Sequence, residues 1–393
     1  MGNPAVLFFL IMFVIGTDTF LISPLIPTLQ DLFHISTGMS GWMMGAYALG
    51  YALFALIAGP LSDGWDRKKV MLGGIICFAV STILCGFATG FWSMFLFRFL
   101  AGVSAAFTSP QVWAAIPALF PPQRIAKVLG TTVAGLAVSQ ALGVPIGDWL
   151  ATSHWSHPFF AIGACSPLLA ALIYFTLPEL KPAQGQGTPT SILAKYVPLL
   201  KSGPARGAFL GYFLFQLGGF GAFAFIGKWM ADGFHLSVDR VGYVMVFVGL
   251  GNLAGDFGGA YILSRFNRLG TMTAGTLLLV TLYLLLPHLP SVGAVAAGFF
   301  FVFIVAGISF PLMMGALVSL SPTIRGTITS LSNSVMYAAA TVGSWFAGSL
   351  YAGFNGFAAV SLFTALCLAL SLVTFLFSGV LAVQPKESRK LAS

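Results

Sequence analysis

The sequence predicts an all-α integral membrane protein with twelve transmembrane helices in two parallel six-helix repeats. Three observations predict this fold class. The chain of 393 residues is 58% hydrophobic and 7% charged, whereas about a quarter of the residues in a soluble domain are charged. Apolar runs recur along the whole length, each near the roughly 20 residues that a helix needs to span the hydrocarbon core. Landmark residues also repeat between the two halves at a nearly constant offset.

The apolar runs define the predicted spans. The first run lacks a basic leading region and a small-residue cleavage site, so we expect a retained helix and not a removed signal peptide. The predicted limits are 5–29, 40–62, 70–90, 91–113, 127–150, 157–177, 206–230, 241–263, 270–288, 291–317, 326–352 and 356–380.

Basic residues gather on one side of this predicted topology. The loops at 63–69, 118–127, 178–206, 264–269 and 321–325, together with the C-terminal tail, hold 15 of the 18 Lys and Arg residues. Cytoplasmic loops carry such an excess, so we expect a multi-pass protein of the cell membrane with both termini in the cytoplasm. The same asymmetry accounts for the net charge of +8 without a nucleic-acid partner.

The longest connection is rich in Pro and Gly and separates six spans from six. We therefore predict an N-terminal six-helix half at 1–177, a cytoplasmic linker at 178–205, and a C-terminal six-helix half at 206–393 with a short basic tail. A short amphipathic stretch at 192–200 is suited to the membrane surface. Parallel duplication of this kind is a transporter architecture, and the repeated landmarks are Gly59 and Gly259, Gly143 and Gly343, Pro110 and Pro311, and Arg124 and Arg325.

Several motifs resemble those of the major facilitator superfamily. "GPLSDGWDRKKV" is similar to the loop between its second and third spans, "RFLAGVSAAF" to its fourth-span motif with a buried arginine, and "ALGVPIGDWL" to the fifth-span motif of exporters. The matching positions are Gly59, Leu61, Asp63, Arg67 and Lys68 in the loop, Arg98 in the fourth span, and Gly143, Pro145 and Gly147 in the fifth, while Asp66 and Asp148 each replace a usual glycine.

Other stretches point to branches within that superfamily. "IGTDTFLISPLIP" resembles the acidic first-span motif of the drug:proton antiporter branch. "GNLAGDFGG" and "SLSNSVMYAAATVGSWFAGS" resemble the arabinose-efflux-permease-like group. The resemblance covers essentially the whole chain and implies the major facilitator fold, with two halves that rock around a central substrate site.

Asp18 and Arg98 are ionisable residues inside predicted spans. Helical rise places them about 16 Å and about 10 Å from the outer ends of their spans, so the two can meet. A carboxylate near the bilayer centre costs roughly 2.5–3.5 kcal/mol and needs a cavity or a partner. We expect both residues to couple transport to protons. The alternatives are an Asp18 that is satisfied by the hydroxyls of Thr17 or Thr19, and an Arg98 that is a fixed counter-ion.

Polar and aromatic residues within spans are candidates for binding substrate. A single residue of this kind more often forms an interhelical hydrogen bond, worth about 0.6 kcal/mol, and most aromatic residues face lipid or core. The candidates are Gln111, Trp113, Gln140, Gln216, Phe220, Asn333 and Tyr337.

Three groups of residues are predicted to gate the transport path. Asp63 is expected to pair with Arg67, or with the start of the eleventh span, and so to stabilise the outward-facing state, with Asp66 as a competing acid for Arg67. Gly59 allows the second and eleventh spans to approach closely beside this contact, and Lys68 belongs to the same charged loop. The motif of Gly143, Pro145 and Gly147 allows close helix packing and a bend, which would seal the fifth span against proton leak. Asn252 and Asp256 share one helix face near the cytoplasmic mouth. Asp148, at an outer span end, is expected to be hydrated and receives no role.

These observations predict a proton-coupled exporter of small amphipathic or lipophilic organic compounds, because few polar side chains line the spans. The alternative is efflux or facilitated transport of sugars or related polar metabolites. The five histidines lie near outer span ends without a catalytic cluster, the four cysteines lack metal-ligand spacing, and no Walker loop is present. We therefore expect neither an enzyme nor an ATP-driven pump. The expected partners are a small-molecule substrate, protons and the lipid bilayer, with no cofactor, and the protein is expected to be a monomer.

Overall fold

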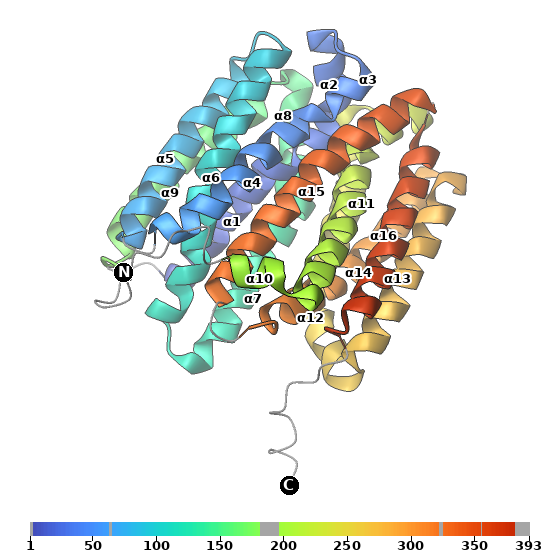
Figure 1. The fold of residues 1–393 in the computed structure, drawn as a ribbon. Helices are drawn as coiled ribbons and strands as arrows, with labels where there is room; N and C mark the ends of the chain where they lie inside the picture. Colours follow the sequence, from blue (N-terminus) through green and yellow to red (C-terminus); the bar gives the residue numbers. More distant parts are fainter. Residues whose placement is uncertain (1–2, 63–64, 181–195, 322–324, 355, 382–393) are drawn as a thin grey trace.

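The computed structural model describes residues 3–62, 65–180, 196–321, 325–354 and 356–381, and it is a bundle of long helices (Figure 1). Within these ranges, eleven helical segments are long and apolar enough to cross a membrane. The predicted all-α membrane fold is confirmed. The division into halves at 178–205 stays a prediction, because residues 181–195 lie outside the described ranges.

The helices follow the order of the predicted spans. The first span consists of α1 and α2, the second is completed by the short α3, and the fifth consists of α7, a π-helical turn η1, and α8. The bounds are α1 Pro4–Phe20, α2 Ile22–Phe33, α3 Thr37–Ser40, α4 Trp42–Ser62, α5 Arg67–Gly86, α6 Phe91–Leu119, α7 Pro122–Val138, η1 Ser139–Gly143, α8 Val144–Ser153, α9 His157–Thr176, α10 Val197–Lys201, α11 Gly203–Phe234, α12 Val238–Arg265, α13 Arg268–Leu285, the 3₁₀ turn η3 Leu286–His288, α14 Val292–Val318, α15 Arg325–Gly353 and α16 Phe357–Ser378.

Helix α15 corresponds to the predicted span 326–352, although it is less apolar than the other eleven segments. Two of its hydroxyls are satisfied within the helix, because Ser332 and Thr341 donate to the carbonyls of Ile328 and Tyr337 at 2.8 and 2.9 Å. The helix packs between α4 and α11 (Figure 1). A span with protein on both sides tolerates hydroxyl-rich composition better than one that faces lipid.

Glycines set how closely α4 and α6 approach each other. A Cβ on Gly50 would collide with the carbonyl group of Phe99, and a Cβ on Gly102 would collide with the carbonyl group of Tyr47. Backbones come this close only where side chains are missing from the contact. The close approach brings the side chain of Tyr47 beside that of Arg98, which is the geometric basis of the site described below.

Helices α1–α9 meet helices α11–α16 chiefly in three places, where α3 and α4 contact α15, where α2 contacts α11, and where α7, η1 and α8 contact α12. Ser334 of α15 donates to the carbonyl of Ala52 at 2.7 Å, and Ser23 of α2 donates to the carbonyl of Phe223 at 2.6 Å. The labels of α2, α3 and α8 lie toward the upper end of the bundle in Figure 1. We name this the outer end, after the predicted orientation, and the opposite end the inner end.

Candidate functional site

A buried ion pair in the N-terminal half joins Asp18 of α1 to Arg98 of α6. Nη1 of Arg98 lies 2.6 Å from Oδ2 of Asp18, and both side chains are 0% exposed. Thr82 of α5 adds a long 3.5 Å contact from its hydroxyl to the other carboxylate oxygen. A buried ion pair tolerates desolvation only while both charges are present, so this pair holds three helices in one electrostatic arrangement.

The guanidinium group of Arg98 is incompletely satisfied by this pairing. Within the described residues, its Nε and Nη2 atoms have no hydrogen-bond acceptor. Its Cζ lies 4.7 Å from the centre of the Tyr47 ring, which gives a cation–π contact. Such a contact is worth about 2 kcal/mol when it is shielded from water. The charge of Arg98 therefore depends mainly on Asp18 and secondarily on the Tyr47 ring.

An aromatic cluster extends from this pair to the other half of the molecule. The ring of Tyr47 lies 6.3 Å from that of Tyr337 on α15, and the ring of Tyr51 stacks on Tyr337 at 3.8 Å. Tyr337 was predicted from the sequence as a substrate residue, whereas Tyr47 and Tyr51 were not. The signal for them was the spacing of two tyrosines by one helical turn in "YALGY", which puts both on the same face of α4.

The fifth span carries a hydrogen bond between side chains of the two halves. Gln140 lies in η1 and accepts a 2.5 Å hydrogen bond from the side-chain amide of Asn252 on α12. The π turn is defined by Val144, whose N–H donates to the carbonyl of Ser139 five residues earlier. A π turn of this kind is uncommon and occurs frequently at functional sites. It precedes Pro145, which lacks an N–H and disfavours a regular helix at this point.

The glycines of the fifth-span motif pack against α1. A Cβ on Gly143 would overlap the side chain of Thr17, and a Cβ on Gly147 would overlap that of Leu21. Thr17 precedes Asp18 in the chain, so the motif lies beside the ion pair. The expected hydration of Asp148 is wrong, because its side chain is fully buried. The reason is that α12 covers this face of α8.

The remaining predicted substrate residues lie on three helices of the bundle. Gln111 on α6 and Gln216 on α11 are buried. Trp113, Phe220 and Asn333 are partly buried, and so is the predicted gate residue Asp256 on α12. Asn252, predicted to share a gate with Asp256, contacts the fifth span.

The charged loop that starts at Gly59 is described only in part. The predicted contacts of Gly59 and Asp63 lie outside the described residues. Asp66 is the N-cap of α5, and its Oδ1 accepts 3.0 Å hydrogen bonds from the backbone N–H groups of Lys68 and Leu180. The ammonium group of Lys68 donates to the carbonyls of Tyr174 and Leu177. Asp66 and Lys68 thus join the start of α5 to the end of α9.

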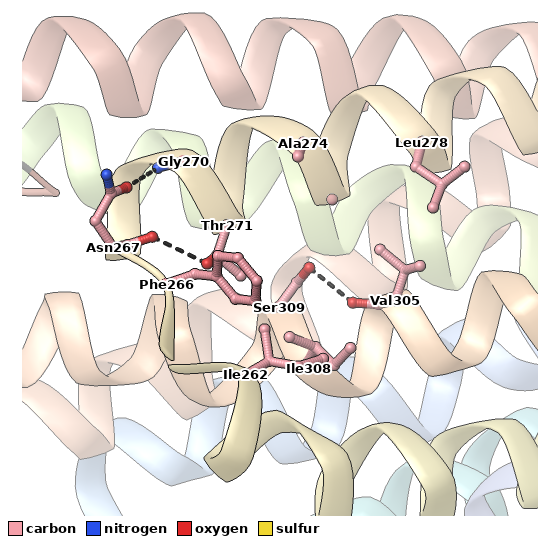
Figure 2. Close-up of a pocket in the computed structure, with 11 residues that line it drawn as sticks. Ile262, Phe266, Asn267, Gly270, Thr271, Ala274, Leu278, Val305, Ile308 and Ser309 are labelled. Carbon is pink, nitrogen blue, oxygen red and sulfur yellow. Dashed lines mark hydrogen bonds between the residues drawn. The ribbon is translucent and has the colours of Figure 1, made fainter. Parts of the chain in front are cut away.

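A cavity of about 410 Å³ lies outside this region, between the end of α12, the start of α13 and α14 (Figure 2). Its polar lining groups already have partners. Asn267 accepts from Thr271 at 2.9 Å and Ser309 donates to the carbonyl of Val305 at 2.8 Å. The other walls are mainly apolar, among them Leu278 and Ile308. None of the predicted substrate residues lines this cavity.

Comparison with known proteins places this geometry among transporters. The model of a family described as Major Facilitator Superfamily matches residues 8–207 and 208–393. The uncharacterized MFS-type transporter YceJ of Bacillus subtilis (strain 168) is 50% identical over 369 residues, which cover 94% of each chain. Multidrug resistance protein 1 of the same bacterium is 33% identical over 174 residues, 43% of this chain and 45% of that protein.

Two further comparisons extend this picture. A probable sugar efflux transporter of Helicobacter pylori (strain HPAG1) is 28% identical over 251 residues, 62% of each chain. Among solved structures, a bacterial homolog of the human lysosomal transporter Spinster, in an inward-facing and unoccupied conformation, matches with a TM-score of 0.73. The match covers 96% of this chain and 95% of that one at 17% identity. At this identity the likeness shows the fold alone.

Proposed function

The chain belongs to the major facilitator superfamily of membrane transporters, and from this premise we propose that it is a proton-coupled exporter of small amphipathic or lipophilic organic compounds. It is a multi-pass membrane transporter and not an enzyme. Under the proposal, the two halves rock around a central site, and inward movement of protons drives export. Both termini lie in the cytoplasm and the working unit is a monomer.

The observation that carries the proposal is the buried ion pair of Asp18 and Arg98. A proton on Asp18 removes the negative charge that offsets Arg98, and leaves the guanidinium beside the Tyr47 ring alone. A buried charge that loses its partner is strongly destabilised, which gives the helices a reason to rearrange. Proton binding and a change in helix packing are thereby linked at one site.

The substrate class is argued from the surroundings of this pair. Tyr51 and Tyr337 stack between α4 and α15, so the contact is broken whenever those helices separate. Under the proposal, the freed rings together with Phe220 and Trp113 form an apolar wall for the substrate, with Gln111, Gln140, Gln216 and Asn333 as polar contacts. Similarity to a multidrug resistance protein supports this class.

Sugar efflux is the second candidate, and one observation favours it. Aromatic faces such as those of Tyr51 and Tyr337 can also stack on a sugar ring, and a relative is named a probable sugar efflux transporter. The polar side chains Gln140 and Asn252 would then supply hydrogen bonds once their mutual contact opens. A facilitator of this kind needs no proton coupling.

The test is export from proteoliposomes with and without an imposed pH gradient, with ethidium as the lipophilic probe and radiolabelled arabinose as the sugar probe. We expect gradient-driven ethidium export that Asp18→Asn abolishes. Asp31→Asn is the matched control, since Asp31 is exposed at the end of α2. Gradient-driven export that survives Asp18→Asn would refute the role of Asp18, and arabinose transport without gradient dependence would favour the second candidate.

The predicted gate residues complete the proposal. Asp63, Arg67 and Gly59 act at the inner end, together with Asp66 and Lys68, which join α5 to α9. The motif of Gly143, Pro145 and Gly147 keeps the fifth span against α1, which supports its role in preventing proton leak. Asn252 and Asp256 act on α12.

A further inference from the structure

Asp148 is a buried acid that the proposed function does not use. It lies in α8, five residues before the helix ends, which is about 8 Å from the outer end at the helical rise. Its side chain is 0% exposed. Among the residues that the structure describes, neither carboxyl oxygen has a hydrogen-bond partner.

The backbone of α12 closes over this carboxyl group. A Cβ on Gly242 would lie 3.2 Å from Oδ2 of Asp148 and 3.3 Å from the Cα of Pro145. Seven residues later on the same face, a Cβ on Gly249 would overlap Ala141. The burial of Asp148 is therefore a product of the contact between the two halves, and it ends when α8 and α12 separate.

The charged groups around Asp148 offer it no neutralising partner in this arrangement. On α12, Asp239 interacts with it electrostatically as a like charge, and the adjoining Arg240 is exposed. The other elements packed against α8 are η1, α9 and α1. The sequence of η1 has no titratable residue, α9 has an exposed His157 at its first position, and α1 has Asp18, which is paired with Arg98.

An ionised carboxylate without a partner is poorly tolerated in such a place. Burying a charge without hydrogen bonds or a counter-ion is so costly that the group binds a proton instead or the structure opens to hydrate it. Contact between α8 and α12 and ionisation of Asp148 therefore exclude each other. Whatever protonates Asp148 favours the contact, and by linkage the contact favours the proton.

We propose that Asp148 is a second proton-binding site, separate from the Asp18–Arg98 pair, whose occupation allows the outer ends of α8 and α12 to close. The inference rests on the alternating-access part of the proposed function and not on proton coupling at Asp18. Acid on the outer side then closes the outer end. The ligand is the proton itself, taken up by a carboxyl group that is hydrated in the open state and covered in the closed one.

The test measures the separation of α8 and α12 in the full-length protein in nanodiscs. Spin labels are attached through Ser153→Cys and Tyr243→Cys, two exposed positions, after the exposed Cys77 and Cys165 are replaced by Ser. The distances between the two spin labels are recorded by double electron–electron resonance spectroscopy from pH 5 to pH 9. We expect the ratio of closed to open molecules to fall about tenfold per pH unit over part of this range, as linkage of one proton requires.

Four variants decide the outcome. Asp148→Asn is expected to remain closed at every pH, and Gly242→Val, which holds α12 away from Asp148, is expected to remain open at every pH. Asp239→Asn and Asp18→Asn are expected to keep the tenfold slope.

A slope that persists in Asp148→Asn or in Gly242→Val would overturn the proposal, as would a single distance at all pH values in the parent protein. Closure that follows sodium concentration at constant pH would overturn it too, in favour of a metal cation. Proton-coupled export in Asp18→Asn tests the Asp18–Arg98 site separately, and its loss would leave the pH slope of the α8–α12 distance unchanged.

Discussion

Removing the charge of Asp18 is expected to destabilise the protein by about 3 kcal/mol. The loss of one partner from a buried ion pair typically costs about 3–5 kcal/mol. In this structure the Tyr47 ring, 4.7 Å from the guanidinium carbon, remains and offsets up to about 2 kcal/mol of that cost. The hydroxyl of Thr82, at 3.5 Å from Asp18, carries no charge and cannot neutralise Arg98. About 3 kcal/mol corresponds to roughly a hundredfold change in an equilibrium constant.

A double-mutant cycle measures this energy. The parent protein, Asp18→Asn, Arg98→Met and the double variant are unfolded with denaturant in the same detergent, and the midpoints together with the slopes of the transitions give the free energies of unfolding. Each single change is expected to be strongly destabilising, while the double variant is expected to recover most of the loss, because it leaves no unpaired charge in the interior. Additive losses in the double variant would refute the reasoning, since they would mean that the two charges do not depend on each other.

Two further predictions concern packing and capping. Gly249→Leu is expected to abolish export while the protein still inserts into the membrane, because the new side chain would overlap Ala141 at the contact between the halves. The control in the same vesicle assay is Gly258→Leu on the same helix, where an added Cβ would have no atom within 4 Å. Asp66→Ala is expected to lower the free energy of unfolding by about 1 kcal/mol through loss of the α5 N-cap. Thermal unfolding measures the change, with Asp31→Ala as the control. An unchanged midpoint in Asp66→Ala would contradict the capping role.

The sequence was sufficient to predict the helical membrane fold and to select the residues of the ion pair. Both successes have the same cause, because charge is rare inside spans and a helix advances by a fixed distance per residue. Depth along two helices was therefore enough to place Asp18 and Arg98 at similar levels. The cation–π contact with Tyr47 could not be obtained in this way, since it depends on how far α4 and α6 rotate and on the close approach at Gly50 and Gly102.

The expectation for Asp148 failed for a related reason. Its depth, about 8 Å from the end of a span, is compatible with hydration, and depth says nothing about which helix covers a given face. The structure places the backbone of α12 there, at Gly242. The hydrogen bond between Asn252 and Gln140 was equally hidden, because the pattern of α12 grouped Asn252 with Asp256 on its own helix and carried no sign of its partner in the other half.

The fifth span connects the two buried acids. On one side, Gly143 and Gly147 bring it against Thr17 of α1 and Leu21 at the C-cap of α1, next to Asp18. On the other side, Asp148 and Gln140 face α12. The π turn includes Gln140 and Gly143, and its backbone hydrogen bonds differ from those of the flanking α-helix. Separation of α8 from α12 therefore either pulls on the contact with α1 and changes the surroundings of Asp18, or is absorbed in the π turn and leaves that contact in place.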